Sequence, residues 1–324
     1  MAEPKELRIV YMGTPDFAVE PLRLLVHEGY NVVATVTVPD KFAGRGQKLN
    51  QLAVKQFALE TGLKVLQPEK LRDPNFVDEL VSLNADLFIV VAFRMLPEII
   101  WRIPKLGTFN LHASLLPNYR GAAPINWAVI NGEKETGVTT FLIDKEIDTG
   151  KILLQRSIPV EPNETAGELH DRLMMVGSTV VIDTVNALAL GNVDPIPQDK
   201  YISQGTPIKP APKLFKESTR ISWEETAQSI NNFIRGLSPY PAAWSELIGP
   251  DSERVSAKVF RSEAIDSRVN AGVGTISTDG KSYLHVTCGD GGVSITEIQL
   301  AGKRRLAISE FLLGFRDIKN FRFE

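Results

Sequence analysis

The chain has 324 residues, a formal net charge of −3, 43% hydrophobic and 23% charged residues, which is the composition of a globular protein long enough for two domains. No run reaches the roughly twenty apolar residues of a membrane span, and residues 1–7 are too short and polar for a signal peptide, so we expect a cytoplasmic protein without membrane contact. The single cysteine, Cys288, excludes an internal disulfide and a cysteine-based zinc cluster, and the histidines lack ligand spacing, so no metal is expected.

Strand-like and helix-like segments alternate through the first part of the chain. We expect helices at about 51–60 and 75–83, and strands at 7–12, 30–38, 64–66 and 87–92. This alternation predicts an α/β domain with a Rossmann-like parallel sheet. The dinucleotide fingerprint G-x-G-x-x-G is missing after the first strand, so neither NAD nor FAD is inferred. Ligands bind such sheets at the carboxyl ends of strands, which makes residues 93–97 a candidate pocket.

Charge is divided unevenly along the chain. Residues 1–206 hold 20 Lys and Arg against 25 Asp and Glu, whereas residues 207–324 hold 16 against 14. Residues 39–49 form a basic, glycine-rich loop, which on its own is more often an ordinary surface segment. The asymmetry permits a nucleic-acid partner but does not demand one.

The densest polar chemistry lies in residues 107–151. Residues 108–112 alternate between apolar and polar, so a strand there points Asn110 and His112 to one face. A neighbouring strand is expected at 138–143, and the loop after it is able to bring Asp148 over the first strand. Between the strands, an amide-rich turn leads into a helix at about 123–130 and suits a planar heterocycle or an anion. Each polar residue alone is more often structural, but the three together predict a site.

A proline-rich linker at about 191–212 separates two expected domains, 1–206 and 207–324. Before it, Thr165 and Glu168 form a capping box that opens a long helix ending at Gly191. After it, a helix at 223–236 and short strands at 257–262, 274–277, 283–287 and 293–300 favour a small β-barrel, and residues 311–323 are expected to close the chain as a helix. Residues 303–305 are the densest basic cluster, with a solvated turn as the plain alternative.

Four segments at this spacing resemble the 10-formyltetrahydrofolate-dependent formyltransferases: Asn110-Leu111-His112, Ser114-Leu115-Leu116-Pro117, Arg120-Gly121 and Asp148-Thr149-Gly150. The resemblance covers nearly the whole chain and is closest to the members that act on methionyl-tRNA. It implies a Rossmann-like formyltransferase domain followed by an OB-like, tRNA-binding barrel. It also implies transfer of the formyl group of 10-formyltetrahydrofolate to the amine of methionine on initiator methionyl-tRNA, for the initiation of protein synthesis.

The resemblance assigns roles to individual residues. Asn110 and His112 would stabilise the oxyanion of the tetrahedral intermediate, where losing one donor typically costs about 10² to 10³ in rate. Asp148 would orient His112, stabilise its charge and help move the proton from the attacking amine toward N10, an effect of roughly 10² to 10⁴. The folate-pocket candidates are Phe93, Met95, Leu96, Ser114, Leu115, Leu116, Pro117 and Asp144. The tRNA-binding candidates are Lys41, Arg45, Lys48, Lys258, Arg261, Lys303, Arg304 and Arg305.

Two features depart from the family pattern: the segment 93–97 is one residue shorter than usual, and Glu146 stands where Gly is common. Two other functions stay open. A formyltransferase acting on an amino-sugar nucleotide, glycinamide ribonucleotide or another small amine would share the three polar residues. A non-catalytic folate- or RNA-binding protein would not be expected to keep all three. A monomer is expected.

Overall fold

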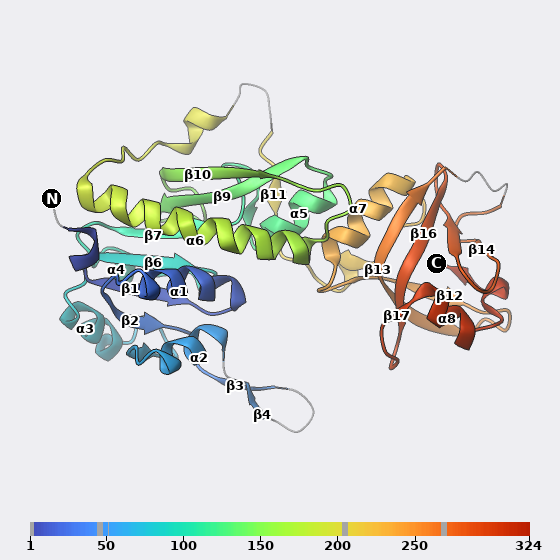
Figure 1. Ribbon diagram of the computed structural model, residues 1–324, viewed down its shortest axis with the longest axis horizontal. Helices are drawn as coiled ribbons and strands as arrows, with labels where there is room; N and C mark the ends of the chain where they lie inside the picture. Colours follow the sequence, from blue (N-terminus) through green and yellow to red (C-terminus); the bar gives the residue numbers. More distant parts are fainter. Residues whose placement is uncertain (1–2, 44–47, 51, 203–206, 267–270) are drawn as a thin grey trace. The chain divides into compact units, whose positions relative to one another are not determined.

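The computed structural model of the chain describes residues 3–43, 48–50, 52–202, 207–266 and 271–324 (Figure 1). Its first large element is a seven-stranded sheet with the order β10-β9-β7-β6-β1-β2-β5. These strands are β1 Ile9–Gly13, β2 Val32–Val36, β5 Val65–Leu66, β6 Leu87–Val91, β7 Thr108–His112, β9 Glu135–Leu142 and β10 Ile152–Pro159.

The expected Rossmann-like parallel sheet is confirmed. Strands β5, β2, β1, β6 and β7 are mutually parallel, and β9 is antiparallel to β7. The chain runs outward from β1 to β2 and β5, and then returns to β6 on the other side of β1. This reversal is a topological switch point, where the carboxyl ends of α/β sheets bind ligands.

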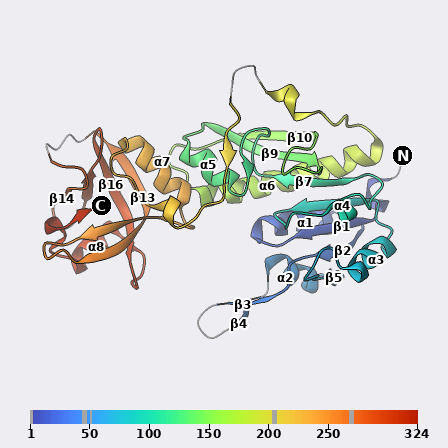
Figure 2. The ribbon, with the colours of Figure 1, turned by 180° about the vertical axis from the view of Figure 1, so that it is seen from behind.

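Helices cover both faces of this sheet. One face carries α1 (Val19–His27) and α6 (Ala166–Leu190) (Figure 1), and the opposite face carries α4 (Glu98–Trp101) (Figure 2). Buried side chains of α3 (Pro74–Ser82) and α4 pack with Val10, Ala34 and Phe88 in one apolar cluster. Helix α2 (Ala53–Glu60) follows a two-stranded hairpin, β3 (Lys41–Ala43) and β4 (Lys48–Asn50).

Helix α6 begins as the sequence predicts. Thr165 N donates to Glu168 Oε2 over 2.8 Å, and Glu168 N donates to Thr165 Oγ1 over 3.2 Å, so the capping box is confirmed. Within the described ranges, α6 is long and apolar enough to cross a membrane by length and composition alone, contrary to the expectation that no run approaches this. Its apolar residues Leu173, Val180, Val181 and Val185 are buried in the protein, and Gly177 lies close over Leu111 of β7. These are the features of a core helix.

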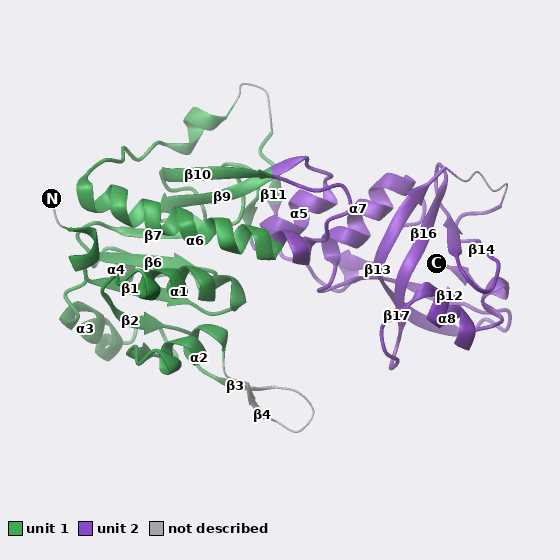
Figure 3. Ribbon diagram, in the orientation of Figure 1, with its two compact units in different colours: residues 1–121, 136–158, 170–210 green, residues 122–135, 159–169, 211–324 purple. Residues whose placement is uncertain are grey.

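Two compact units divide the chain (Figure 3). The first comprises residues 1–121, 136–158 and 170–210, and the second comprises residues 122–135, 159–169 and 211–324. Two segments that precede residue 206, 122–135 and 159–169, pack with the second unit. One segment holds α5 (Pro124–Ile130), whose Asn126 Nδ2 donates to Gly236 O over 2.8 Å in α7 (Ala227–Leu237).

The second unit contains the expected small antiparallel barrel. Its strands follow the order β14-β15-β16-β13-β12-β18, and an isolated antiparallel bridge between Thr275 and Arg322 nearly closes the cylinder. The bounds are β12 Ala243–Ile248, β13 Arg254–Ile265, β14 Ile276–Thr278, β15 Leu284–Thr287, β16 Gly292–Leu300, β17 Leu306–Ala307 and β18 Arg322–Phe323.

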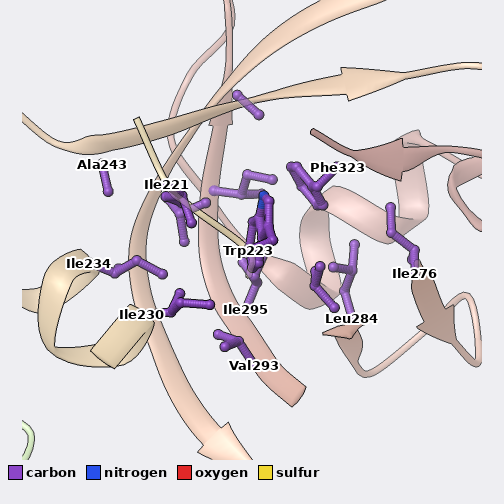
Figure 4. Packing of buried hydrophobic residues seen from close by; sticks show 14 of the residues in the cluster. Ile221, Trp223, Ile230, Ile234, Ala243, Ile276, Leu284, Val293, Ile295 and Phe323 are labelled. Carbon is purple, nitrogen blue, oxygen red and sulfur yellow. The ribbon is translucent and has the colours of Figure 1, made fainter. Parts of the chain in front are cut away.

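The core of this barrel gathers side chains from its strands and α7 around Trp223 (Figure 4). The Trp223 ring packs against Phe323 at a centroid distance of 5.2 Å, and its Nε1 donates to Ser245 Oγ. The expected terminal helix over 311–323 is wrong: α8 spans only Ile308–Gly314, and Phe323 returns to the barrel as a strand beside β12. Burial of Phe323 against Trp223 favours the strand.

Candidate active site

Strand β7 carries two of the three polar residues at its carboxyl end. Asn110 and His112 are two residues apart and therefore share a face of the sheet. The His112 side chain is 7% exposed, and its Nε2 lies 2.8 Å from the carbonyl oxygen of Tyr119. Since a carbonyl oxygen only accepts, Nε2 is the nitrogen that donates. This contact fixes the orientation of the imidazole ring.

Asp148 lies in the loop between β9 and β10, and the structure brings it to His112. Its Oδ2 lies 3.9 Å from His112 Nδ1 and accepts a hydrogen bond from Gly121 N over 3.0 Å. Its backbone adopts a left-handed conformation with φ of +56°, which is uncommon outside glycine. The expected convergence of a carboxylate on the β7 strand is therefore present.

The Asn110 side chain is incompletely satisfied. Its Oδ1 is buried and has no hydrogen-bond partner among the described residues. A buried polar atom without a partner costs about 1–3 kcal/mol, and such atoms concentrate where a ligand completes the bonding. In the same described ranges, no group of three or more His, Cys, Asp or Glu side chains is placed to hold a metal ion.

The turn after β7 is held by its own hydrogen bonds. Thr139 Oγ1 donates to Ser114 O over 2.6 Å and accepts from Leu116 N over 3.1 Å. Ser114 Oγ donates to Asn118 O over 2.7 Å, so this hydroxyl is used inside the turn. Leu116 and Pro117 are buried and Leu115 is half-buried. These residues shape a rigid wall beside His112.

The other folate-pocket candidates have different environments. Phe93 is half-buried, Met95 is 69% exposed, and Leu96 is buried in the apolar cluster that α3 and α4 share. Arg94, between them, donates to the carbonyls of Pro68 and Glu69. Asp144 is exposed, and its Oδ1 accepts from Glu146 N and Thr149 Oγ1, so it braces the loop that carries Asp148.

The basic candidates of the barrel fall into two groups. Arg261 pairs with Glu168 and Glu297, and Arg305 pairs with Glu297 and lies over the ring of Phe260. Lys258 Nζ donates to Pro241 O, whereas Lys303 and Arg304 are exposed and make no ion pair within the described part of the chain. Lys41 and Lys48 lie in the β3–β4 hairpin, and Arg45 lies outside the described residues.

Sequence reasoning missed two glutamines. Gln155 Nε2 donates to Leu116 O and Thr139 Oγ1, and Gln198 Nε2 donates to the carbonyls of Asp148 and Gly150. Gln155 lies in a strand and Gln198 follows a proline-rich run, so no local pattern marks either residue.

An α/β sheet with an Asn, His and Asp group at the carboxyl end of β7, followed by a small barrel, defines a formyl-transferring enzyme of the kind the sequence resembles. Residues 7–185 match the Formyl transferase family, and residues 213–316 match the Formyl transferase, C-terminal domain family. The methionyl-tRNA formyltransferase of Parabacteroides distasonis is 54% identical over 318 residues, covering 98% of each chain, and that of Bacteroides thetaiotaomicron is 56% identical over 312 residues, covering 96% of this chain and 97% of the relative. This chain belongs to the methionyl-tRNA formyltransferase family.

The fold has solved relatives too. The N-formyltransferase from Helicobacter canadensis, in complex with folinic acid and dTDP-3-aminofucose, superposes with a TM-score of 0.62 over 93% of this chain and 100% of that chain, at 18% identity. At this identity the likeness concerns the fold alone.

Proposed function

We propose that this chain transfers the formyl group of 10-formyltetrahydrofolate to the amino group of methionine on initiator methionyl-tRNA. The observation that carries the proposal is the meeting of His112 and Asp148 at the carboxyl end of β7, in a chain whose curated relatives at 46–56% identity are methionyl-tRNA formyltransferases. The alternative with a small amine as acceptor shares these residues, but the full-length identity to the tRNA enzymes favours the tRNA.

The hydrogen bond from His112 to Tyr119 sets the proton chemistry of the site. With Nε2–H donated to the Tyr119 carbonyl, a neutral His112 presents the bare lone pair of Nδ1 toward the Asp148 carboxylate. Because His112 Nδ1 and the Asp148 carboxylate are both acceptors, the two groups together can bind one proton. The pair therefore accepts the proton that the amine loses as it attacks the formyl carbon, and Asp148 stabilises the imidazolium that results. When the bond between the formyl carbon and N10 breaks, the same proton passes to N10, so that tetrahydrofolate leaves and the pair is restored.

Of Asn110 and His112, Asn110 alone supplies the charge stabilisation of the oxyanion, because both ring nitrogens of His112 are directed at Tyr119 and Asp148. This differs from the oxyanion contact that the resemblance implied for His112. The Asn110 amide has a buried oxygen that lacks a partner, and its N–H group donates to the developing oxyanion. A fixed amide dipole in a water-poor site stabilises such charge without reorganising. The substrates fit this site, because an N–H group of the bound folate or of the attacking amine can donate to the Asn110 oxygen that the described chain leaves without a partner. The wall formed by residues 114–117, together with Phe93 and Met95, would hold the pterin, and Leu96 and Asp144 support the wall and the loop.

The tRNA contacts are proposed for exposed cations. Lys303 and Arg304 carry charges that no carboxylate of the described chain neutralises, whereas Arg261 and Arg305 would have to exchange an internal ion pair for a phosphate. We assign the principal barrel contacts to Lys303, Arg304 and Lys258, and the contacts of the 39–49 segment to Lys41, Arg45 and Lys48. The protein is proposed to act as a monomer in the cytoplasm, where charged initiator tRNA is used.

Formyl transfer is tested with methionyl initiator tRNA, uncharged initiator tRNA and an amino-sugar nucleotide as parallel acceptors. Formylation of the charged tRNA alone is expected. Transfer only to the amino-sugar nucleotide would contradict the tRNA as acceptor but would keep the proposed formyl transfer by Asn110, His112 and Asp148. Release of no tetrahydrofolate with any acceptor would contradict enzymatic function. Light scattering of the purified protein measures its molar mass and so tests whether it is a monomer.

A further inference from the structure

Gln198 is a buried side chain that makes four hydrogen bonds near Asp148. It is 4% exposed. Its Nε2 donates to Asp148 O over 2.8 Å and to Gly150 O over 2.9 Å. Its Oε1 accepts from Arg120 Nε over 3.0 Å and from a terminal nitrogen of Arg120 over 2.6 Å. A primary amide has two donors and two lone pairs, so Gln198 uses its full bonding capacity on residues of the first unit.

The loop that Gln198 holds has an unusual backbone. Asp148 has a φ of +56°, a left-handed conformation that is uncommon for non-glycine residues, although Asp adopts it more readily than most. A Cβ on Gly150 would lie 1.7 Å from Leu142 O, so the loop returns tightly against the end of β9. Gln198 bridges the carbonyls on the two sides of Thr149 and thereby fixes the peptide planes that direct the Asp148 side chain.

The Gln198 amide also holds the segment that donates a hydrogen bond to the Asp148 carboxylate. Gly121 N donates to Asp148 Oδ2, and Arg120, the preceding residue, is the side chain that Gln198 Oε1 accepts from. Gln198 thus holds the residue that carries the carboxylate and the residue next to its hydrogen-bond donor. Removal of the Gln198 amide would therefore free both the Asp148 backbone and the Arg120 side chain next to Gly121.

We propose that Gln198 is a positioning residue for formyl transfer, which holds the Asp148 carboxylate in register with His112. The inference rests on the proposed function for the role of Asp148. It goes beyond that function because Gln198 contacts neither His112 nor the reacting groups and acts through the loop. Misplacement of a catalytic group by about 1 Å costs up to roughly 10² in rate, which sets the size of the expected effect.

Two substitutions separate hydrogen bonding from volume. Gln198→Ala removes all four contacts, and Gln198→Glu keeps the size and the acceptor for Arg120 but removes both N–H donors. Both variants should lower kcat for methionyl-tRNA formylation about 10- to 100-fold, with KM for the formyl donor nearly unchanged. The matched control is Asn126→Ala, which removes a half-buried amide bond to Gly236 O in the second unit and should leave kcat unchanged. Wild-type turnover in both Gln198 variants would overturn the inference.

A double-mutant cycle tests whether Gln198 acts through Asp148. In the Asp148→Asn background, adding Gln198→Ala should cost less than about threefold, because the group it positions is already lost. An equal loss in both backgrounds would show a general structural effect and overturn the inference.

Amide hydrogen exchange gives a readout that needs no substrate. Peptides covering residues 144–150 should exchange faster in Gln198→Ala than in wild type, while peptides of β1 and β6 stay unchanged. If the wild type formylates no acceptor, the proposed function fails and this comparison decides on the positioning of the loop alone. Unchanged exchange at 144–150 would overturn the inference independently.

Discussion

His112 Nδ1 and Asp148 Oδ2 face each other across 3.9 Å, whereas the other ring nitrogen of His112 lies 2.8 Å from the carbonyl of Tyr119. The separation is too long for a direct hydrogen bond. Catalytic contacts in unliganded enzymes are commonly long and tighten in the substrate complex. Because the Tyr119 carbonyl holds one side of the ring and Gln198 holds the Asp148 backbone, the gap is expected to close by a shift of the Asp148 carboxylate itself.

Asp148→Asn should separate charge from shape. The substituted amide keeps an oxygen for the Gly121 N–H but removes the negative charge that stabilises a protonated His112. We expect kcat to fall by about 10² to 10⁴, with a KM for the formyl donor close to that of wild type. Single-turnover formylation of methionyl-tRNA measures the effect. Asp183→Asn, at an exposed ion pair with Arg156, is the control, and an Asp148→Asn rate equal to it would remove Asp148 from the mechanism.

Asn110→Ala should uncouple activity from stability. The substitution removes a buried oxygen that has no partner among the described residues, so the melting temperature should hold or rise slightly, since the cost of an unpaired polar atom is relieved. The rate should fall by about 10² to 10³, because one oxyanion donor is lost. Calorimetry and initial rates on the same preparation test both statements. A large drop in melting temperature with an unchanged rate would assign Asn110 a structural role instead.

Local patterns in the sequence predicted much of this structure. The strand at residues 108–112, the neighbouring strand and the Thr165–Glu168 capping box follow from alternation and from short-range capping chemistry, and all three are present. These features depend on residues close together in the chain, where backbone geometry alone constrains the outcome.

Long-range contacts account for what sequence patterns could not supply. Gln198 contacts Asp148, which is fifty positions earlier in the chain. The sequence around Gln198 predicts only a proline-rich linker. Phe323 becomes a strand residue because Trp223, a hundred positions earlier, packs against it in the barrel core. The pairing of Arg261 with Glu168 is likewise a long-range contact, and it engages an exposed cation that the resemblance placed among the tRNA-binding candidates.

Arg304→Ala should reduce the salt dependence of tRNA binding. An exposed cation that contacts a phosphate contributes about one unit to the slope of log affinity against log salt, and Arg304 makes no ion pair within the described part of the chain. Arg305→Ala should change the slope less, since Glu297 already engages that guanidinium. Filter binding of methionyl-tRNA at several salt concentrations measures both slopes, and folate affinity should be the same in both variants. Equal slopes for wild type and Arg304→Ala would exclude this contact.

Glu168→Gln should weaken the start of α6 in a pH-dependent manner. The Thr165 backbone N–H, followed by the Arg261 guanidinium, holds the pKa of Glu168 below its ordinary value. A carboxyl with a lowered folded pKa contributes stability above its unfolded pKa of about 4.3 and loses it as the pH falls through the folded pKa. At pH 7 the free energy of unfolding of the variant should be lower by about 1 kcal/mol or less, because the contact is half-exposed.

Melting temperatures at several pH values test this account of Glu168. The melting-temperature difference between Glu168→Gln and wild type should shrink as the pH falls below about 4. Glu263→Gln, on the exposed side of β13, should show no such difference, and a pH-independent deficit in Glu168→Gln would contradict the charge-based account.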